Sequence, residues 1–289
     1  MTVVILTHNE AVNIAACVEI LSVFAEVVVV DSGSTDGTLT IVREHFPNVR
    51  ILEHTFQDFG QQRNWALDHA NASHEWILFL DADERCTPAF AEAIDAAVSD
   101  PRDNVGFFLC YRNMFLGQWI KRCTMYPTWQ LRLLKAGHVR YVKDGHGQRE
   151  VMDGRAGYID VPYDHFGFNK GIKEWIARHN EYSTNEVELL ESMRRAPLRI
   201  LDVFARDRVE RHRALKRLGA HTPLRPVVRF FHLYVIRGGC RDGRAGFLYC
   251  CLQFAHELHI LAKRSELNHG RRAARHSPAP LSHANNILE

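Results

Sequence analysis

Several patterns that define common classes of protein are missing from this sequence of 289 residues. No uninterrupted apolar run reaches the roughly 18 residues that a membrane-spanning helix requires, so we expect no such helix. No basic region or cleavage site precedes the apolar residues 2–6, so we expect no secretory signal. The seven cysteines form neither Cys-x-x-Cys pairs nor a metal-binding spacing, which is typical of reduced cytosolic thiols.

Two phosphate-binding motifs and early positive charge are also missing. The sequence contains no Gly-x-Gly-x-x-Gly and no Walker motif, which disfavours a dinucleotide-dependent or ATP-dependent enzyme. Residues 1–42 contain no Lys or Arg. This absence disfavours a nucleotidyltransferase, a class that usually has a basic, glycine-rich phosphate loop near its N-terminus.

Charge is distributed unevenly along the chain. Residues 1–100 carry 16 acidic and 4 basic side chains, whereas residues 194–244 carry 14 basic and 4 acidic side chains. The overall net charge of +2 conceals this contrast. Such polarity predicts two segments with different roles.

The most informative stretch is residues 76–84. Its five apolar residues, 76–80, are typical of a buried parallel strand, and Asp81, Asp83 and Glu84 follow within four positions. Because side chains alternate along a strand, we expect Asp81 and Asp83 to point the same way. Two carboxylates at the end of a buried strand repel each other, and a hard cation such as Mg²⁺ or Mn²⁺ would compensate them. The alternative is a solvated acidic loop.

Strands and helices alternate in the first hundred residues. The hydrophobic pattern predicts strands at 2–6, 26–30, 49–53 and 76–80, and helices at 11–24, 38–46, 60–70 and 88–98. This alternation favours an α/β protein with a doubly wound, mostly parallel sheet. Thr7, Asp31 and the Asp81/Asp83 pair each follow a predicted strand. Ligands bind beyond the carboxyl ends of strands in such sheets, so we expect one pocket there.

Four motifs occur in a particular order along this half of the chain. They are Thr-His-Asn-Glu at 7–10, Asp-Ser-Gly-Ser-Thr-Asp-Gly-Thr at 31–38, Arg63-Asn64, and Asp-Ala-Asp-Glu at 81–84. Together they resemble the inverting family 2 glycosyltransferases of GT-A fold, most closely the bacterial branch with lipopolysaccharide core β-1,4-glucosyltransferases. The resemblance covers about residues 2–190. It implies a GT-A catalytic domain with helices on both faces of its sheet.

The resemblance also implies roles for particular residues. Nucleotide-sugar contacts are expected at Thr7, Asn9, Glu10, Asp31, Ser32, Gly33, Arg63, Asp81 and Ala82. Mg²⁺ or Mn²⁺ is expected on Asp83, assisted by Asp81, with His165 as a further ligand or diphosphate contact; alternatively His165 is a hydrogen-bonded core residue. The implied donor is UDP-glucose by default, and the implied acceptor is a hydroxyl of a lipid-linked, lipopolysaccharide or exopolysaccharide molecule.

Residues 101–192 form the expected acceptor-binding half of the catalytic domain. The pattern predicts strands at 105–112, 126–134 and 157–161, a loop at 117–122 and an amphipathic helix at 170–192. Trp129, Gln130 and Arg132 are the acceptor candidates, and Trp119 and Trp129 offer either a sugar-binding surface or core packing. Residues 144–150 read as a loop, with Glu150 as first candidate for general base and Asp144 second. The alternative is a surface turn with ordinary ion pairs.

The basic C-terminal part differs from this catalytic domain, 1–192. We expect a basic helix at 198–218, an aromatic and basic segment at 225–236 that includes Phe230, Phe231 and Tyr234, and an apolar helix at 247–261. Residues 193–267 therefore predict association with an anionic bilayer, placing the protein peripherally on the cytoplasmic face of a bacterial inner membrane. A solvated helical face or a nucleic-acid adaptor is the alternative, although we expect no nucleic-acid partner. Residues 268–289 are polar and predict a disordered tail.

Overall fold

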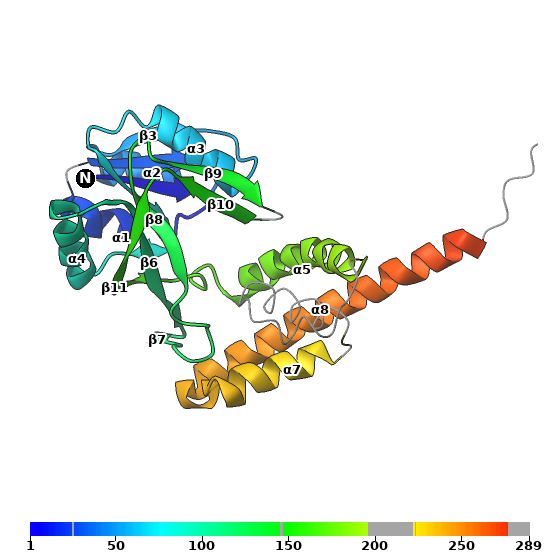
Figure 1. The fold of residues 1–289 in the computed structure, drawn as a ribbon. Helices are drawn as coiled ribbons and strands as arrows, with labels where there is room; N and C mark the ends of the chain where they lie inside the picture. Colours follow the sequence, from blue (N-terminus) through cyan, green and yellow to red (C-terminus); the bar gives the residue numbers. More distant parts are fainter. Residues whose placement is uncertain (25, 145–146, 196–221, 223, 277–289) are drawn as a thin grey trace, which may run out of the picture. The chain divides into compact units, whose positions relative to one another are not determined.

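The computed structural model describes the chain except for residues 25, 145–146, 196–221, 223 and 277–289 (Figure 1). The chain divides into two compact units, Met1–Arg178 with Phe230–Cys251, and His179–Arg229 with Leu252–Glu289. The first unit contains the whole sheet and the second is built from helices. The basic helix expected at 198–218 lies outside the described residues.

The strands of the first unit follow the chain from β1 to β11. Their bounds are β1 Thr2–Thr7, β2 Glu26–Asp31, β3 Arg50–Glu53, β4 Trp76–Asp81, β5 Glu84–Arg85, β6 Asn104–Phe115, β7 Gln118–Trp119, β8 Trp129–Lys135, β9 Val139–Asp144, β10 Gly147–Met152 and β11 Arg155–His165. The helices are α1 Ile14–Glu19, η1 Ile20–Val23, α2 Thr38–His45, α3 Phe59–His69, α4 Pro88–Ser99, α5 Ile172–Arg195, α7 Arg225–Phe231, η3 His232–Ile236, η4 Gly239–Asp242 and α8 Gly243–His276.

One mixed sheet organises the first unit. Its strand order is β3-β2-β1-β4-β8-β6-β11-β5, with β7 paired to β6. Strands β3, β2, β1 and β4 are all parallel, β8 is antiparallel to both β4 and β6, and β11 is parallel to β6. The mostly parallel α/β sheet predicted from the sequence is therefore confirmed. Strands β9 and β10 form a separate antiparallel hairpin beside α3 (Figure 1).

Both faces of β1, β2 and β4 are buried, which explains their unbroken apolar sequences. Alternate residues of β1 pack on opposite sides, Val3 and Ile5 with α1 and α4, and Val4 with α3 and the β9–β10 hairpin. Thr87 caps the first turn of α4 and Pro88 occupies its first position, so the helix begins where the sequence predicted. These two cores hold the strand ends that carry the polar motifs.

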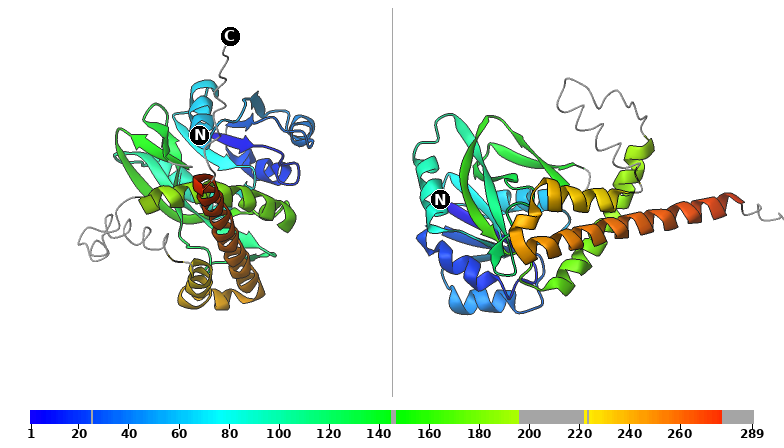
Figure 2. Two further views of the ribbon diagram at one scale, coloured as in Figure 1. Left: turned by 90° about the vertical axis from the view of Figure 1, so that its right-hand side faces the viewer. Right: turned by 90° about the horizontal axis from the view of Figure 1, so that it is seen from below.

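Several elements differ from the sequence predictions. The helix predicted at 11–24 is divided into α1 and the short η1. The prediction of a loop at 144–150 is wrong, because residue 144 belongs to β9 and residues 147–150 belong to β10. Residues 268–276, where the sequence predicts a disordered tail, continue α8 in the structure (Figure 2). Ion pairs from Arg264 and Arg271 to Glu191 hold α8 against α5, and a polar composition alone did not show these partners.

The helical unit has a small apolar core and a group of ion-paired side chains. Val187, Leu190 and Ile260 are buried together. Arg225 bridges two carboxylates, with Nη2 2.9 Å from Glu186 Oε1 and Nε 2.7 Å from Glu257 Oε2. Among the described helices, none is long and apolar enough to cross a membrane.

Candidate active site

The candidate site begins where three neighbouring parallel strands end. Thr7 of β1 pairs in register with Asp31 of β2, and Leu6 pairs with Asp81 of β4. The sheet thus brings together residues 24 to 74 positions apart along the chain, all at the carboxyl edge. Their gathering at one edge agrees with the position expected for a ligand site in a parallel sheet.

Asp31 organises the loop that follows β2. Its carboxylate accepts hydrogen bonds from the backbone N–H groups of Gly33 at 2.9 Å and Ser34 at 2.7 Å. Gly33 has a φ of 83°, a conformation that favours glycine, and this explains the residue at that position. Asn9 ties the loop after β1 to the same turn, because its Oδ1 accepts from Thr35 N at 2.7 Å. Both loops are therefore fixed before any ligand binds.

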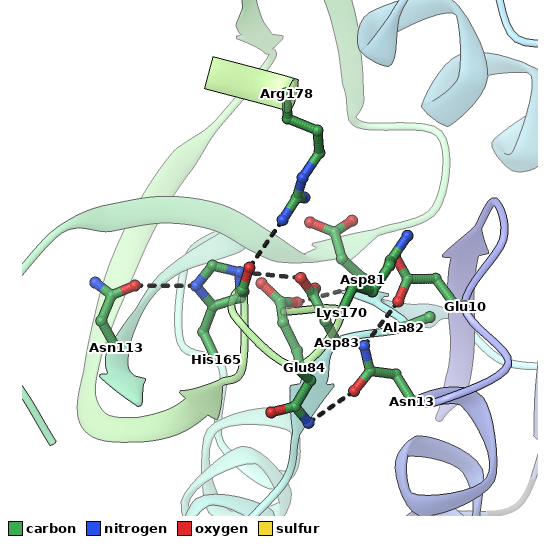
Figure 3. A network of polar contacts seen from close by, with 12 residues as sticks. Glu10, Asn13, Asp81, Ala82, Asp83, Glu84, Asn113, His165, Lys170 and Arg178 are labelled. Atoms are coloured by element: carbon green, nitrogen blue, oxygen red, sulfur yellow. Dashed lines mark hydrogen bonds and ion pairs between the residues drawn. The ribbon is translucent and has the colours of Figure 1, made fainter. Parts of the chain in front are cut away.

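Glu10 stands at the start of the helical turn after β1 (Figure 3). It faces the carboxylates of Asp81, Asp83 and Glu84, which we call the acidic rim. Its carboxylate pairs with Lys170 Nζ at 2.6 Å and accepts from Asn13 Nδ2 at 2.8 Å. Burial raises the pKa of Glu10, although these two partners counteract the shift. Lys170 lies just beyond β11, so a cation from late in the sequence compensates an acid at its start.

Asp81 is held by two buried arginines. Arg132 of β8 donates to its Oδ2 at 2.7 Å and to its Oδ1 at 3.3 Å, and Arg63 of α3 lies 3.5 Å from Oδ1. Burial alone would raise the pKa of Asp81, but the positive charges of Arg132 and Arg63 outweigh it and hold that pKa well below its usual range. Asp81 is consequently an ionised, fixed acceptor.

Glu84 is a member of the site that the sequence did not identify. It is buried on β5, where its Oε2 accepts from the Asp81 N–H at 2.8 Å and its Oε1 accepts from Tyr163 Oη at 3.1 Å. Arg132 lies 3.2 Å from the same Oε1. Burial raises the pKa of Glu84 to about 7, more than the charge of Arg132 lowers it. The sequence placed Arg132 at the acceptor, whereas the structure places it 4% exposed between two carboxylates.

Asp83 and His165 form a second pair beside Asp81 (Figure 3). His165 Nε2 lies 3.4 Å from Asp83 Oδ2, and His165 Nδ1 lies 3.0 Å from Asn113 Oδ1, which orients the ring. Burial would lower the pKa of His165, but the hydrogen bond and charge of Asp83 raise it. Asp81 points instead to the arginines. In the part of the chain that the structure describes, no group of three or more acidic, His or Cys side chains is placed to hold a metal.

Helix α3 contributes three consecutive residues to the site. Gln62 Nε2 donates to Ser32 Oγ at 3.1 Å, and Arg63 Nη1 donates to Gln148 Oε1 at 2.9 Å. Asn64 exchanges two hydrogen bonds with the backbone of Tyr141. The helix therefore connects the loop after β2, the acidic rim and the β9–β10 hairpin.

Among the two base candidates, Glu150 can be placed. It is half-buried on β10, directly opposite Tyr141 of β9. The side chain of Asp144 is outside those that the structure describes.

The other acceptor candidates occupy mixed positions. Trp129 packs edge-on against Tyr158, with ring centroids 5.0 Å apart, and Gln130 Oε1 accepts from Arg132 Nε at 2.8 Å. Trp119 lies beneath the cationic side chains of Arg112 and Lys121. Gln130 and Arg132 thus support the acidic rim.

Two buried polar atoms beside the acidic rim have no partner within the described protein. These are Thr7 Oγ1 and Arg63 Nε. Ala82 is also buried, and its carbonyl accepts from Arg85 Nη1 at 2.8 Å. Thr7 and Arg63 can therefore serve a polar ligand that covers this edge.

A mostly parallel sheet with an acidic carboxyl edge is the arrangement expected of a nucleotide-diphospho-sugar transferase of GT-A fold. Residues 2–158 match the model for "Glycosyl transferase family 2", and the chain belongs to that family. The enzyme class and fold predicted from the four ordered motifs are confirmed: the protein is a nucleotide-sugar glycosyltransferase.

Curated relatives and solved structures resemble the chain over different lengths. "Lipopolysaccharide core biosynthesis glycosyltransferase LpsC" of Rhizobium meliloti is 26% identical over 249 residues, covering 84% of each chain. Glycosyltransferase SunS of Bacillus subtilis is 40% identical over 81 residues, which are 27% of this chain and 19% of SunS. Mannosyltransferase PcManGT of Pyrobaculum calidifontis, solved with GDP-Man and Mn²⁺, is 19% identical with 91% and 86% coverage and a TM-score of 0.47. S. aureus TarS 1–349 is 15% identical with 94% and 91% coverage and a TM-score of 0.42.

Proposed function

We propose that this enzyme transfers a sugar, by default glucose from UDP-glucose, to a hydroxyl of a lipid-linked, lipopolysaccharide or exopolysaccharide acceptor, with inversion. One observation carries the proposal. Arg63 links the acidic rim to the hairpin, since it contacts Asp81 on one side and Gln148 on the other. Glu150 lies two residues from Gln148, so a carboxylate on the hairpin shares the rim's neighbourhood. The similarity to a relative named for lipopolysaccharide core biosynthesis supports the acceptor class.

The residues around Asp83 fit a divalent metal ion. Its carboxylate and the His165 ring are adjacent, and Asn113 orients that ring as outer hydrogen-bond partners do in metal sites. One carboxylate and one imidazole suffice where substrate phosphates supply further ligands to Mg²⁺ or Mn²⁺. When bound, the metal would stabilise negative charge on the departing diphosphate. Asp81 fits this role poorly, because arginines occupy both of its oxygens.

The donor would bind along the edge formed by Thr7, Asp31 and Arg63. The guanidinium of Arg63 suits a phosphate or a base edge, and its Nε has no partner among the described residues. Asp31 and Asp81 provide fixed acceptors for ribose hydroxyls or base N–H groups. Because hydrogen bonds already orient each of these carboxylates, little ordering is required when the nucleotide binds.

Transfer itself needs a base for the acceptor hydroxyl. We assign Glu150 to accept that proton while the hydroxyl oxygen attacks the anomeric carbon and the diphosphate leaves from the opposite face. A single displacement of this kind inverts the anomeric centre. It requires no covalent intermediate on the enzyme.

The experiment that tests this function measures release of the nucleoside diphosphate, which is UDP from a UDP-sugar and GDP from GDP-mannose. The full chain is incubated with UDP-glucose and Mn²⁺, with UDP-galactose, UDP-GlcNAc and GDP-mannose as parallel donors. We expect release above the uncatalysed rate with at least one donor, and further stimulation by lipopolysaccharide core or lipid-linked saccharide. Release from GDP-mannose alone would contradict the UDP-sugar assignment, and no release from any donor, with acceptor present, would contradict the proposal.

We further propose that the protein docks peripherally on the cytoplasmic face of the inner membrane. Phe231, Val235 and Ile236 are each about half exposed or more, and Phe247 packs against the neighbouring Tyr234 with ring centroids 5.7 Å apart. We call these four exposed residues, Phe231, Val235, Ile236 and Phe247, the apolar edge. The exposed cations Arg122, Arg241 and Arg244 belong to the same unit. Apolar side chains accompanied by cations are complementary to an anionic bilayer.

The structure changes which apolar residues should enter the lipid. Phe230 and Tyr234 stack on each other, with ring centroids 5.4 Å apart, and are only partly exposed. Phe231 and Ile236 are the better anchors because more than half of each is exposed. Three surface cations would contribute about 3 kcal/mol at low salt.

Vesicle sedimentation tests the docking surface. We expect binding to vesicles that contain phosphatidylglycerol, weakening but not abolition at high salt, and a loss of at least about tenfold in the double variant Phe231→Ser/Ile236→Ser. Ile20→Ser, which changes an exposed apolar residue outside the apolar edge, should bind like the parent chain. Binding to RNA with a steep salt dependence, without vesicle binding, would contradict the membrane proposal.

A further inference from the structure

We propose that Asn64 is a positioning residue for catalysis, because it fixes β9, the strand that pairs with β10 and so with Glu150. This inference rests on the proposed function and adds a residue to it. Asn64 Nδ2 donates to Tyr141 O at 2.8 Å, and Asn64 Oδ1 accepts from Tyr141 N at 2.9 Å. The side-chain amide thus occupies both backbone groups of one residue, 77 positions further along the chain.

The hairpin needs such an attachment. Strands β9 and β10 form a two-stranded sheet, apart from the large sheet in the described structure. A two-stranded hairpin is marginally stable by itself, and its outer edge leaves backbone groups unpaired. The asparagine side chain carries a carbonyl oxygen and an NH₂ group, which are arranged like the C=O and N–H of a peptide group. Asn64 therefore pairs with the edge of β9 as a residue of a neighbouring strand would.

The register of the hairpin connects this attachment to Glu150. Glu150 is the residue directly opposite Tyr141. The backbone N–H and C=O of Tyr141 both point to Asn64 and therefore away from β10. Tyr141 and Glu150 consequently form the non-hydrogen-bonded kind of antiparallel pair. In that kind of pair the two side chains lie closest. A shift of Tyr141 would therefore move the carboxylate of Glu150.

The direction of the Glu150 side chain follows from its neighbours. Tyr141, Gln148 and Glu150 share one face of the hairpin, because opposite residues and alternate residues lie on the same side. The Arg63 guanidinium is 5.7 Å from the centroid of the Tyr141 ring and bonds to Gln148. The same guanidinium contacts Asp81. The face that carries Glu150 is thus the one turned to the acidic rim, whereas Arg140, Val142 and Val151 on the other face are exposed.

A one-residue slip would reverse these faces. It would turn the Glu150 side chain away from the rim and present Arg149 or Val151 instead. The apolar packing of Tyr141 against Phe79 opposes such a slip, but it acts on the ring rather than on the backbone. Asn64 is the contact that fixes the backbone itself.

The chain offers a matched control on the same two elements. Asp68 of α3 pairs with Arg140 of β9 at 2.7 Å, and about half of each side chain is exposed. This ion pair also joins α3 to β9, but it involves no backbone group and a surface pair contributes little. Asp68→Asn therefore removes a connection between the same elements without freeing Tyr141.

The test compares Asn64→Leu, Asn64→Asp and Asp68→Asn in the full-length chain. The assays are UDP release from UDP-glucose with Mn²⁺, and UDP affinity by calorimetry. We expect Asn64→Leu to lower the maximal rate of release by about 10- to 100-fold, since small displacements of a reacting group have effects of this size. Asn64→Asp, which keeps the acceptor for Tyr141 N–H, should lose less. UDP affinity should stay within about twofold, and Asp68→Asn should match the parent chain.

A double-mutant cycle distinguishes positioning from general damage. In a Glu150→Gln background, Asn64→Leu should cause little further loss, because the group that it positions is already missing. Hydrogen exchange should rise in residues 139–152 of Asn64→Leu and remain unchanged in Asp68→Asn. An equal loss in both backgrounds, or no loss beyond that of Asp68→Asn, would overturn the proposal. If Glu150→Gln alone leaves release unchanged, it is the base assignment that has failed, and the role of Asn64 fails with it.

Discussion

Asp83→Asn is expected to weaken Mn²⁺-dependent binding of UDP by at least about 100-fold while leaving the fold intact. The substitution keeps the size of the side chain and removes its charge. In the Asp-Ala-Asp-Glu motif, Asp81 and Glu84 contact arginine in the described structure, whereas the neighbour of Asp83 is His165. A neutral amide would bind a hard cation less well than a carboxylate does.

Calorimetry of UDP with and without Mn²⁺ measures this effect. Asp95→Asn, a change of an exposed acid on α4, is the control and should behave like the parent chain. Thermal unfolding should show that both variants remain folded. An unchanged metal-dependent affinity for UDP in Asp83→Asn would remove Asp83 from the site.

Glu150→Gln should leave donor binding intact and reduce transfer by about 10²- to 10⁴-fold, the usual contribution of a general base. The amide cannot accept the proton of the acceptor hydroxyl, whereas the contacts of Arg63 and Asp81 with the donor remain. The measurement is the rate of UDP release together with UDP affinity, so that a loss of rate is separated from a loss of binding.

Arg149→Gln is the matched control for this change. It introduces the same residue at the adjacent position of β10, where the side chain is exposed on the other face of the hairpin. It should retain most of the activity. If Asp144→Asn loses activity and Glu150→Gln does not, the base is Asp144.

Much of the nucleotide-binding half could be predicted from the sequence, because its signals are local. Unbroken apolar runs of four or five residues mark the buried parallel strands β1, β2 and β4, and the polar motif after each run lies at a strand end. Parallel strands end at one edge, so the proximity of Thr7, Asp31 and Asp81 followed from connectivity alone. These predictions needed no knowledge of long-range packing.

The missed features depend on partners far apart in the sequence. Glu84 was assigned no role beyond its place in the Asp-Ala-Asp-Glu motif, and its burial follows from Arg132 and Tyr163, which β8 and β11 bring to it. Residues 144–150 looked like a loop because they combine two glycines with several charged side chains. The role of Asn64 rests on a contact with Tyr141 that no local pattern contains.

The source of the cations at the site has a consequence for how an anion can bind. The first hundred residues carry a large excess of acids, yet a nucleotide diphosphate is itself strongly negative. Arg132 and Lys170 neutralise Glu84, Asp81 and Glu10 from segments that follow residue 112. A fragment ending near residue 100 would therefore repel the donor, although it contains all four sequence motifs. The motifs determine where the nucleotide binds, and Arg132 and Lys170 reduce the negative charge of that site.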